Sequence, residues 1–72
     1  MEKFSERVKE LRQARGLSQD ALGKIIGVKR YSVYTYEKGR NYPDIPRLIA
    51  LADFFEVTTD YLLGRSDTPK GP

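Results

Sequence analysis

The segment from residue 18 to residue 38 restricts the fold of this sequence more than any other. Apolar residues recur at helical spacing in two short stretches, 18–26 and 29–38, which only Gly27 and Val28 separate. A link this short keeps two helices from packing antiparallel, and a glycine within it is typical of two helices that meet at a steep angle. The sequence therefore predicts a helix, a tight turn and a second helix over this segment.

Three further helices are expected around this unit. An apolar stripe at helical spacing predicts a helix over about residues 5–15. Asp44 is a favourable helix N-cap, and the apolar residues after it predict a helix that reaches residue 55. Thr58 is a second such cap, for a short helix over residues 59–63. Because the alternation that marks strands is missing, we predict a compact, all-α domain of five helices.

One domain is expected, and its composition limits its chemistry. Residues 1–64 carry the helical patterns, whereas residues 65–72 lack large apolar side chains and are predicted to form a flexible C-terminal tail. The sequence contains no cysteine and no histidine, which excludes disulfides, thiol nucleophiles, histidine bases and zinc sites with nitrogen or sulfur ligands. We therefore expect no enzymatic activity, no metal site and no cofactor.

Neither a membrane span nor a signal peptide is predicted. No apolar run approaches the length of about 18 residues that a span requires. The first ten residues are charged throughout and lack the apolar core of a signal peptide. A cytoplasmic protein without a membrane partner is therefore expected.

Positive charge gathers in the first part of the chain. Residues 1–40 hold ten Lys or Arg and five Asp or Glu, whereas residues 41–72 hold three and five. The basic part is the one expected to meet a polyanion. An ordinary solvated helix surface explains the charge equally well, so the charge alone does not decide between them.

The second helix of the unit, over about residues 29–38, separates into two faces on a helical wheel. Val33 and Tyr36 form the face expected to pack in the core. The opposite face carries two cations, two tyrosines, a threonine and no acid: Arg30, Tyr31, Tyr34, Thr35 and Lys38. Such groups can bind guanine, phosphates, base edges and thymine methyls. The alternative is a solvent-exposed face, but two aromatic residues without an acid favour contact with a DNA groove.

Polar residues at both ends of the unit are candidates for contact with the DNA backbone. Ser18 and Gln19 open the first helix, where free N–H groups and the helix dipole suit a phosphate. Gln19 is also explained as a brace for the second helix or as an ordinary first-turn residue. Lys38, Arg40 and Asn41 follow the second helix, where they either complement its dipole or hold a phosphate.

Glu37 lies on the inward side of the second helix, four residues after Val33. A carboxylate there needs a partner, since an unpaired buried charge is very costly. Arg12, beside the apolar stripe of the first helix in the chain, is the predicted partner, and the pair would set the angle between their helices. The alternative is a glutamate at the helix edge, in water.

The segment GLSQDALGKIIGVKRYSVYTYEKG, residues 16–39, resembles the Cro and phage-repressor type of helix-turn-helix regulator, also called the xenobiotic-response-element family. The resemblance continues through NYPDIPRLIALADFFEVTTDYLLG and so covers about residues 4–64. It depends on Leu17-Ser18-Gln19, Gly27, Glu37, Gly39-Arg40, Pro43 and Asp60-Tyr61-Leu62-Leu63-Gly64. It implies a lambda-repressor-like domain that places the helix over about residues 29–38 in the major groove of DNA.

The resemblance also implies roles for single residues. The base-reading positions are Arg30, Tyr31 and Thr35, with Tyr34 beside them. The positions facing the DNA backbone are Gln19, Lys38, Arg40 and Asn41. Arg12 and Glu37 match the buried ion pair of the family. The family often binds palindromic operators as dimers through its fifth helix, which places the interface at Val57, Thr59, Tyr61 and Leu62.

Three positions depart from the family pattern. Lys29 stands where the helix N-cap is usually Ser or Thr, so a cation near phosphate replaces a cap. Family members often have Gln at Tyr31 and Lys or Gln at Thr35, so the operator sequence does not follow from the family. Glu56 stands where many members have Gly, and a left-handed backbone there would be strained.

We therefore predict a sequence-specific, double-stranded DNA-binding transcriptional regulator that acts as a repressor. A homodimer on a palindromic operator is expected, and a regulatory protein partner remains open. The alternative is the antitoxin half of a toxin–antitoxin pair, a protein-interaction module that also binds DNA.

Overall fold

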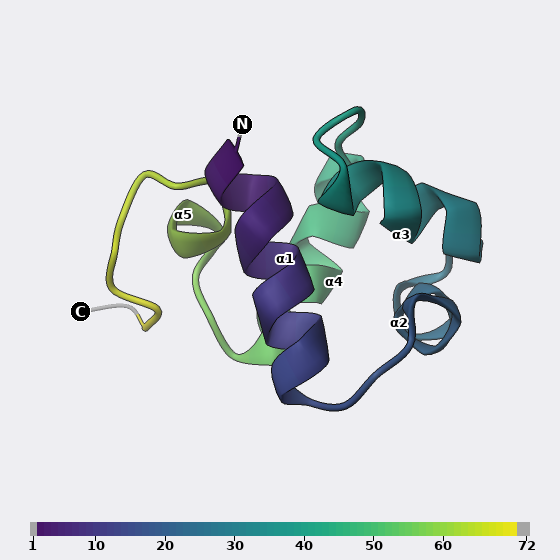
Figure 1. Ribbon diagram of the computed structural model, residues 1–72. Helices are drawn as coiled ribbons and strands as arrows, with labels where there is room; N and C mark the ends of the chain where they lie inside the picture. Colours follow the sequence, from purple (N-terminus) through teal and green to yellow (C-terminus); the bar gives the residue numbers. More distant parts are fainter. Residues whose placement is uncertain (1, 71–72) are drawn as a thin grey trace.

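The computed structural model describes residues 2–70 of the chain, and this part is all-helical (Figure 1). The helices in chain order are α1 (Glu2–Ala14), α2 (Gln19–Ile26), α3 (Arg30–Glu37), α4 (Ile45–Phe55) and α5 (Thr59–Leu62). No residue from 2 to 70 lies in a strand. The prediction of an all-α domain with five helices is therefore confirmed, although α1 begins three residues earlier than expected.

Side-chain caps fix where three of the helices begin. Ser18, Asp44 and Thr58 each accept a hydrogen bond from the backbone N–H three residues later, at 3.0 Å in all three cases. Each such cap satisfies one of the N–H groups that a helix start leaves free, and contributes about 1 kcal/mol. Lys29, at the start of α3, has an extended backbone but makes no side-chain cap. The start of α3 therefore lacks the side-chain cap that α2, α4 and α5 have.

The core lies between the five helices, where α1 packs against α3 and α5. All five helices contribute to it, and its buried members are Phe4, Val8, Leu22, Ile26, Val33, Tyr36, Leu51, Ala52, Phe55 and Leu62. The ring of Phe4 meets the edge of Tyr36, with 6.4 Å between centroids, and so joins α1 to α3. In Figure 1, α2 and α3 lie on one side of α1, and α5 lies on the other.

Leu62 corrects one prediction from the sequence. This residue was placed in a dimer interface, but its exposed fraction is 0% and it belongs to the core. Leu62 ends a four-residue helix and Leu63 follows it directly, and the sequence does not show which of the two leucines faces inward. The neighbouring Leu63 remains 41% exposed and takes the outward position.

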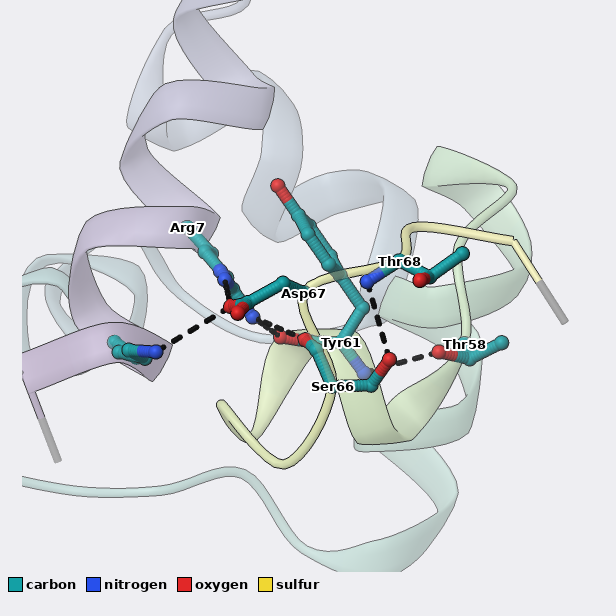
Figure 2. A network of polar contacts seen from close by, with 7 residues as sticks. Arg7, Thr58, Tyr61, Ser66, Asp67 and Thr68 are labelled. Atoms are coloured by element: carbon teal, nitrogen blue, oxygen red, sulfur yellow. Dashed lines mark hydrogen bonds and ion pairs between the residues drawn. The ribbon is translucent and has the colours of Figure 1, made fainter.

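The segment after α5 folds back on the domain instead of extending away from it as a tail (Figure 2). The guanidinium of Arg7 donates to the carbonyl oxygen of Ser66 at 2.8 Å and to the carboxylate of Asp67 at 2.9 Å. It also donates to the carbonyl oxygen of Tyr61 and lies 4.0 Å from the centroid of the Tyr61 ring. One arginine of α1 therefore holds α5 and the following segment together.

Two further contacts close this segment. The amide of Thr58 donates to the carbonyl oxygen of Pro69 at 2.9 Å, and Lys3 lies 3.4 Å from the carboxylate of Asp67. Hydrogen bonds from Arg7 and Lys3 lower the pKa of Asp67 below its usual value. The predicted flexible tail thus differs from the structure over residues 65–70, while its last two residues, 71–72, lie outside the described part of the chain.

Glu56 ends α4 in the left-handed conformation, with a φ of 57°. Its backbone N–H donates to carbonyl oxygens of the last turn, as glycine usually does at this position. A side chain in this conformation is strained because its Cβ approaches the following carbonyl oxygen. The strain expected from the sequence is therefore present.

Within the described chain, no helix combines the length and the apolar character that crossing a bilayer requires.

Candidate nucleic-acid interface

A tight turn joins α2 to α3 and fixes how they meet. Gly27 ends α2 with a φ of 82°, a conformation that glycine adopts without strain. The amides of Gly27 and Val28 both donate to the carbonyl oxygen of Gly23, at 2.8 Å each. Behind the turn, Leu22, Ile26 and Val33 are buried in the core. The turn and the core together hold α3 at one angle to α2.

Gly23 allows the turn to close onto α2. A Cβ built on this residue would lie 2.6 Å from the carbonyl oxygen of Val28. Real Cβ atoms do not come that close to a backbone oxygen, so any side chain here would push the turn away. This role of Gly23 was not predicted from the sequence. The only signal was a glycine inside a helical pattern, which marks a close approach in some proteins.

Arg47 ties α4 to the same turn and was also missed. Its Nη2 donates to the carbonyl oxygen of Gly27 at 3.2 Å, and its Nη1 lies 2.9 Å from the carboxylate of Asp44. Asp44 is the N-cap of α4, so a single arginine joins that cap to the turn before α3. No sequence pattern predicted this contact, because Arg47 and Gly27 lie 20 residues apart.

Arg12 and Glu37 lie together and join α1 to α3. Arg12 Nε donates to Glu37 Oε2 at 2.6 Å and Nη2 donates to Oε1 at 3.0 Å, which is a bidentate pair. The side chains are only 12% and 4% exposed, respectively. The hydrogen bonds to Glu37 raise the pKa of Arg12 above its ordinary value. The alternative of a glutamate at the helix edge in water is therefore excluded.

Two more groups complete this buried cluster. Arg12 Nη1 donates to the carbonyl oxygen of Leu17 at 2.8 Å, and Gln19 Nε2 donates to Glu37 Oε1 at 3.2 Å. Gln19 thus braces α3 with its side-chain amide, one of the roles considered for it from the sequence. Because Gln19 opens α2, the cluster links α1, α2 and α3 through one carboxylate.

The exposed face of α3 carries cationic and aromatic groups. Arg30 is exposed, and within residues 2–70 its side chain has no hydrogen bond or ion pair. Tyr31 is 68% exposed, and its ring stacks on that of Tyr34 with 6.0 Å between centroids and 29° between planes. The Lys38 ammonium lies 5.7 Å from the Tyr34 centroid. These side chains come from one helix face, where Tyr31, Tyr34 and Lys38 contact one another.

Thr35 does not belong to this exposed face. The prediction placed it beside Tyr31 and Tyr34, and this placement is wrong because Thr35 is only 7% exposed. Its hydroxyl donates to the carbonyl oxygen of Ser32 at 2.7 Å and so stays against its own helix. A helical wheel gives the direction of a side chain on an isolated helix but not what the rest of the chain packs over it. Thr35 therefore supports the helix instead of presenting a polar group outward.

A surface hollow lies between the start of α2 and the exposed face of α3. Its lining consists of Gln19, Arg30, Tyr31 and Tyr34, and its volume is about 390 Å³. The lining holds no acidic residue and is mostly apolar. Four residues that the sequence singled out for DNA contact are thus brought to one place.

The remaining candidates for the backbone are exposed around this face. They are Ser18, Lys29, Lys38, Arg40 and Asn41. Lys29 lies directly before α3, and Lys38 ends it. Ser18 lies directly before α2. Arg40 and Asn41 lie in the loop after α3, where the amide of Arg40 donates to the carbonyl oxygen of Thr35 at 3.0 Å. Positive charge therefore lies at both ends of α3.

The geometry is that of a helix-turn-helix domain, and sequence comparison agrees. A family model described as helix-turn-helix matches residues 8–62. The chain belongs to this family, the Cro/C1-type helix-turn-helix proteins, which includes phage repressors and transcriptional regulators.

Curated relatives are similar over most of this chain. The uncharacterized HTH-type transcriptional regulator YobD of Bacillus subtilis is 33% identical over 66 residues, which cover 92% of this chain and 59% of YobD. The cryptic phage CTXphi transcriptional repressor RstR of Vibrio cholerae is 34% identical over 65 residues, or 90% of this chain and 59% of RstR. The chain thus spans less than two thirds of these relatives. Nothing among these relatives supports a toxin–antitoxin module.

Solved structures share the fold. The P22 c2 repressor in complex with a synthetic operator superposes with a TM-score of 0.81 at 29% identity, covering 86% of this chain and 94% of that one. The restriction-modification controller protein C.AhdI from Aeromonas hydrophila gives a TM-score of 0.74 at 33% identity, covering 85% and 92%. The lambda-repressor-like fold is confirmed.

Proposed function

We propose that this chain binds double-stranded DNA sequence-specifically, as the DNA-binding domain of a transcriptional regulator that acts as a repressor. The observation that carries the proposal is the exposed face of α3, where Arg30 and two stacked tyrosines stand on a rigidly braced unit. The operator complex of the similar P22 c2 repressor supports it. The function is binding without catalysis, and we place it in the cytoplasm, where DNA is accessible.

In this proposal α3 lies in the major groove and reads bases from one face. Arg30 donates two hydrogen bonds to guanine, and Tyr31 and Tyr34 contact the neighbouring base edges. Thr35 is left out because it is buried. These side chains project from one side of a helix whose opposite side is held in the core by Val33.

The DNA backbone is held at both ends of α3. The start of α2, at Ser18 and Gln19, offers free N–H groups and the positive end of a helix dipole to one phosphate. The next phosphates are held by three side chains at the end of α3 and in the following loop, from Lys38, Arg40 and Asn41. Lys29, directly before α3, holds another. Phosphate contacts of this kind fix the register of α3 without selecting a sequence.

Two arginine variants separate these roles in fluorescence-anisotropy titrations on duplexes selected from a random pool. Arg30→Ala is expected to cost about 1–3 kcal/mol on the selected operator and to relax the preference at one base pair. Arg40→Ala is expected to weaken binding to all duplexes evenly and to reduce the slope of log K against log salt concentration by about one. Arg65→Ala, which removes the same charge beyond α5, is the control and should change little.

The selection itself decides the proposal. If no duplex is preferred and the binding equals that of a generic basic peptide, the chain is not a sequence-specific DNA-binding domain. If Arg30→Ala weakens binding to all duplexes evenly, the domain binds DNA but Arg30 does not read a base.

We further propose that two copies bind a palindromic operator. The interface would involve the exposed part of the α5 region, where Val57, Thr59 and Tyr61 are half-buried and Leu63 is exposed. Two α3 helices about 34 Å apart would then enter successive major grooves. Sedimentation velocity of the chain on duplexes with one and two half-sites tests this. A single copy bound to the duplex with two half-sites would contradict the dimer.

A further inference from the structure

The start of α3 is held less firmly by its own residues than the starts of the neighbouring helices. Lys29 has the extended backbone that an N-cap residue adopts, but its side chain makes no cap. The first hydrogen bond of α3, from the amide of Val33 to the carbonyl oxygen of Lys29, is 3.4 Å long, whereas the corresponding bonds of α2 and α4 measure 3.0 and 2.9 Å. A cation at a helix N-terminus also opposes the helix dipole. The first turn of α3 therefore depends on contacts from elsewhere in the chain.

Arg47 of α4 reaches the turn before α3. Its Nη2 and Nε donate to the carbonyl oxygen of Gly27 at 3.2 and 3.4 Å, and its Nη1 lies 2.9 Å from the carboxylate of Asp44. Gly27 precedes Lys29 by two residues, so the contact lies close to the uncapped helix start. A guanidinium at the end of α2 also complements the dipole of that helix. Arg47 thus holds the segment from which α3 begins.

The position of α4 gives this contact a fixed reference. Leu51, Ala52 and Phe55 of α4 are buried in the core. Asp44 accepts a hydrogen bond from the backbone amide of Arg47 at 3.0 Å and so caps α4. A different side chain at position 47 leaves that amide, and with it the cap, in place. Removing the guanidinium therefore costs the contact with the turn and a partly exposed ion pair, which contributes little.

We propose that Arg47 is a positioning residue for base recognition, because it holds the turn before α3 in place of the cap that α3 lacks. This inference rests on the proposed DNA-binding function. Arg30 is the first residue of α3, so it belongs to the turn of helix that this contact steadies. A side chain that reads bases must be held within about 0.5 Å of its productive geometry. Arg47 therefore supports the choice of sequence without touching DNA itself.

The test compares, by fluorescence anisotropy, the Kd for a selected operator with the Kd for a scrambled duplex. Arg47→Met keeps an unbranched apolar stem and removes the donors, and it should fold because this side chain is 39% exposed. Its Kd for the operator is expected to rise about fivefold, the factor that corresponds to the loss of one helix cap. Its Kd for the scrambled duplex, and the slope of log K against log salt concentration, should not change. Arg65→Met, which removes the same charge beyond α5, is the control and should leave both Kd values unchanged.

A cap supplied at position 29 should make Arg47 dispensable. Lys29 has the same extended backbone as Ser18, so in Lys29→Ser the new hydroxyl can accept from the amide of Ser32 as Ser18 accepts from its own helix. Lys29→Ser also removes a cation, so both duplexes lose affinity and the salt slope falls by about one. In this background Arg47→Met is expected to leave the ratio of the two Kd values unchanged. In the Lys29→Ala background, which loses the cation without gaining a cap, Arg47→Met should still change the ratio about fivefold.

The outcomes separate this inference from the function on which it rests. If Arg47→Met raises both Kd values by the same factor, Arg47 acts on DNA binding in general, through a phosphate if the salt slope falls as well, and the proposal is wrong. If the ratio of the two Kd values keeps its wild-type value, the turn holds α3 without Arg47, and the proposal is also wrong. A ratio that changes equally in the Lys29→Ser and Lys29→Ala backgrounds would show that Arg47 does not stand in for a cap. Failure to select any operator would instead remove the proposed function itself.

Discussion

The α-carbon of Gly23 faces the carbonyl oxygen of Val28 so closely that a Cβ on this residue would lie 2.6 Å from the oxygen. The neighbouring atom belongs to the backbone of the turn, so it cannot rotate away as a side chain would. The distance between α2 and the turn before α3 is therefore set by the absence of a side chain at one position.

Gly23→Ala should destabilise the domain although alanine favours helices by about 1 kcal/mol over glycine. The clash at Val28 forces the turn outward, and overpacking of this kind costs about 1–3 kcal/mol. Urea unfolding followed by circular dichroism measures the change. Lys24→Ala, on an exposed neighbour whose ion pair with Asp20 is a surface pair, is the control. A Gly23→Ala variant as stable as the wild type would show that the turn shifts freely.

The Arg12–Glu37 pair should behave as one unit in a double-mutant cycle. Glu37→Leu alone leaves a buried guanidinium without its carboxylate and should cost about 3 kcal/mol of unfolding free energy. Arg12→Met combined with Glu37→Leu should recover most of that loss, because both buried charges are removed. Thermal or urea unfolding gives the coupling energy. A loss in the double variant equal to the sum of the losses in the two single variants would mean that the two charges do not interact.

The strain at Glu56 predicts a stabilising substitution. Glycine tolerates the φ of 57° without the Cβ contact, so Glu56→Gly should raise the unfolding free energy by about 0.5–1 kcal/mol. The matched control is Asp53→Gly, an exposed position within α4, which should lose a similar amount. Urea unfolding of both variants measures the difference. If Glu56→Gly loses stability as Asp53→Gly does, the backbone at Glu56 is not strained.

The contact between Arg7 and Asp67 predicts that the segment over residues 65–70 detaches in acid. Hydrogen bonds from Arg7 and Lys3 lower the pKa of Asp67 below its ordinary 3.8. The contact is therefore fully present above pH 3.8. It is lost as the pH falls through the lower pKa that Asp67 has in the folded protein. The ¹⁵N heteronuclear NOE of the Thr68 and Lys70 amides should fall over that window.

A variant checks this assignment at neutral pH. Asp67→Asn should lower the same NOE values without acid, because the amide cannot pair with the guanidinium as a carboxylate does. Asp53→Asn, an exposed change on α4, should leave them unchanged. Low NOE values in the wild type at neutral pH would show that this segment is free in solution.

The sequence predicts the elements of this domain well because their signals are local. Ser18, Asp44 and Thr58 act within three residues of themselves, and each caps a helix as expected. The turn at Gly27 depends on one glycine and its immediate neighbours. Family resemblance and helical spacing together suggested that Arg12 and Glu37 meet, although 25 residues separate them.

The features that were missed depend on what another part of the chain places nearby. Arg7 contacts residues more than 50 positions later, and no sequence pattern in α1 distinguishes it from the other cations of that helix. The importance of Gly23 depends on the path of the turn. Thr35 was misplaced because an ideal wheel ignores what the rest of the chain packs over a side chain, and Leu62 because a single turn of helix has no periodicity to read.

Arg47 joins the N-cap of α4 to the carbonyl oxygen of Gly27, so the loop between α3 and α4 is tied down at the same point as the turn before α3. We expect the two segments that flank α3 to move with it as one body. A ligand that binds this body meets a surface whose backbone is already ordered. The heat capacity change of binding should then reflect the area covered alone, without the large negative contribution that accompanies folding of a disordered segment on its partner.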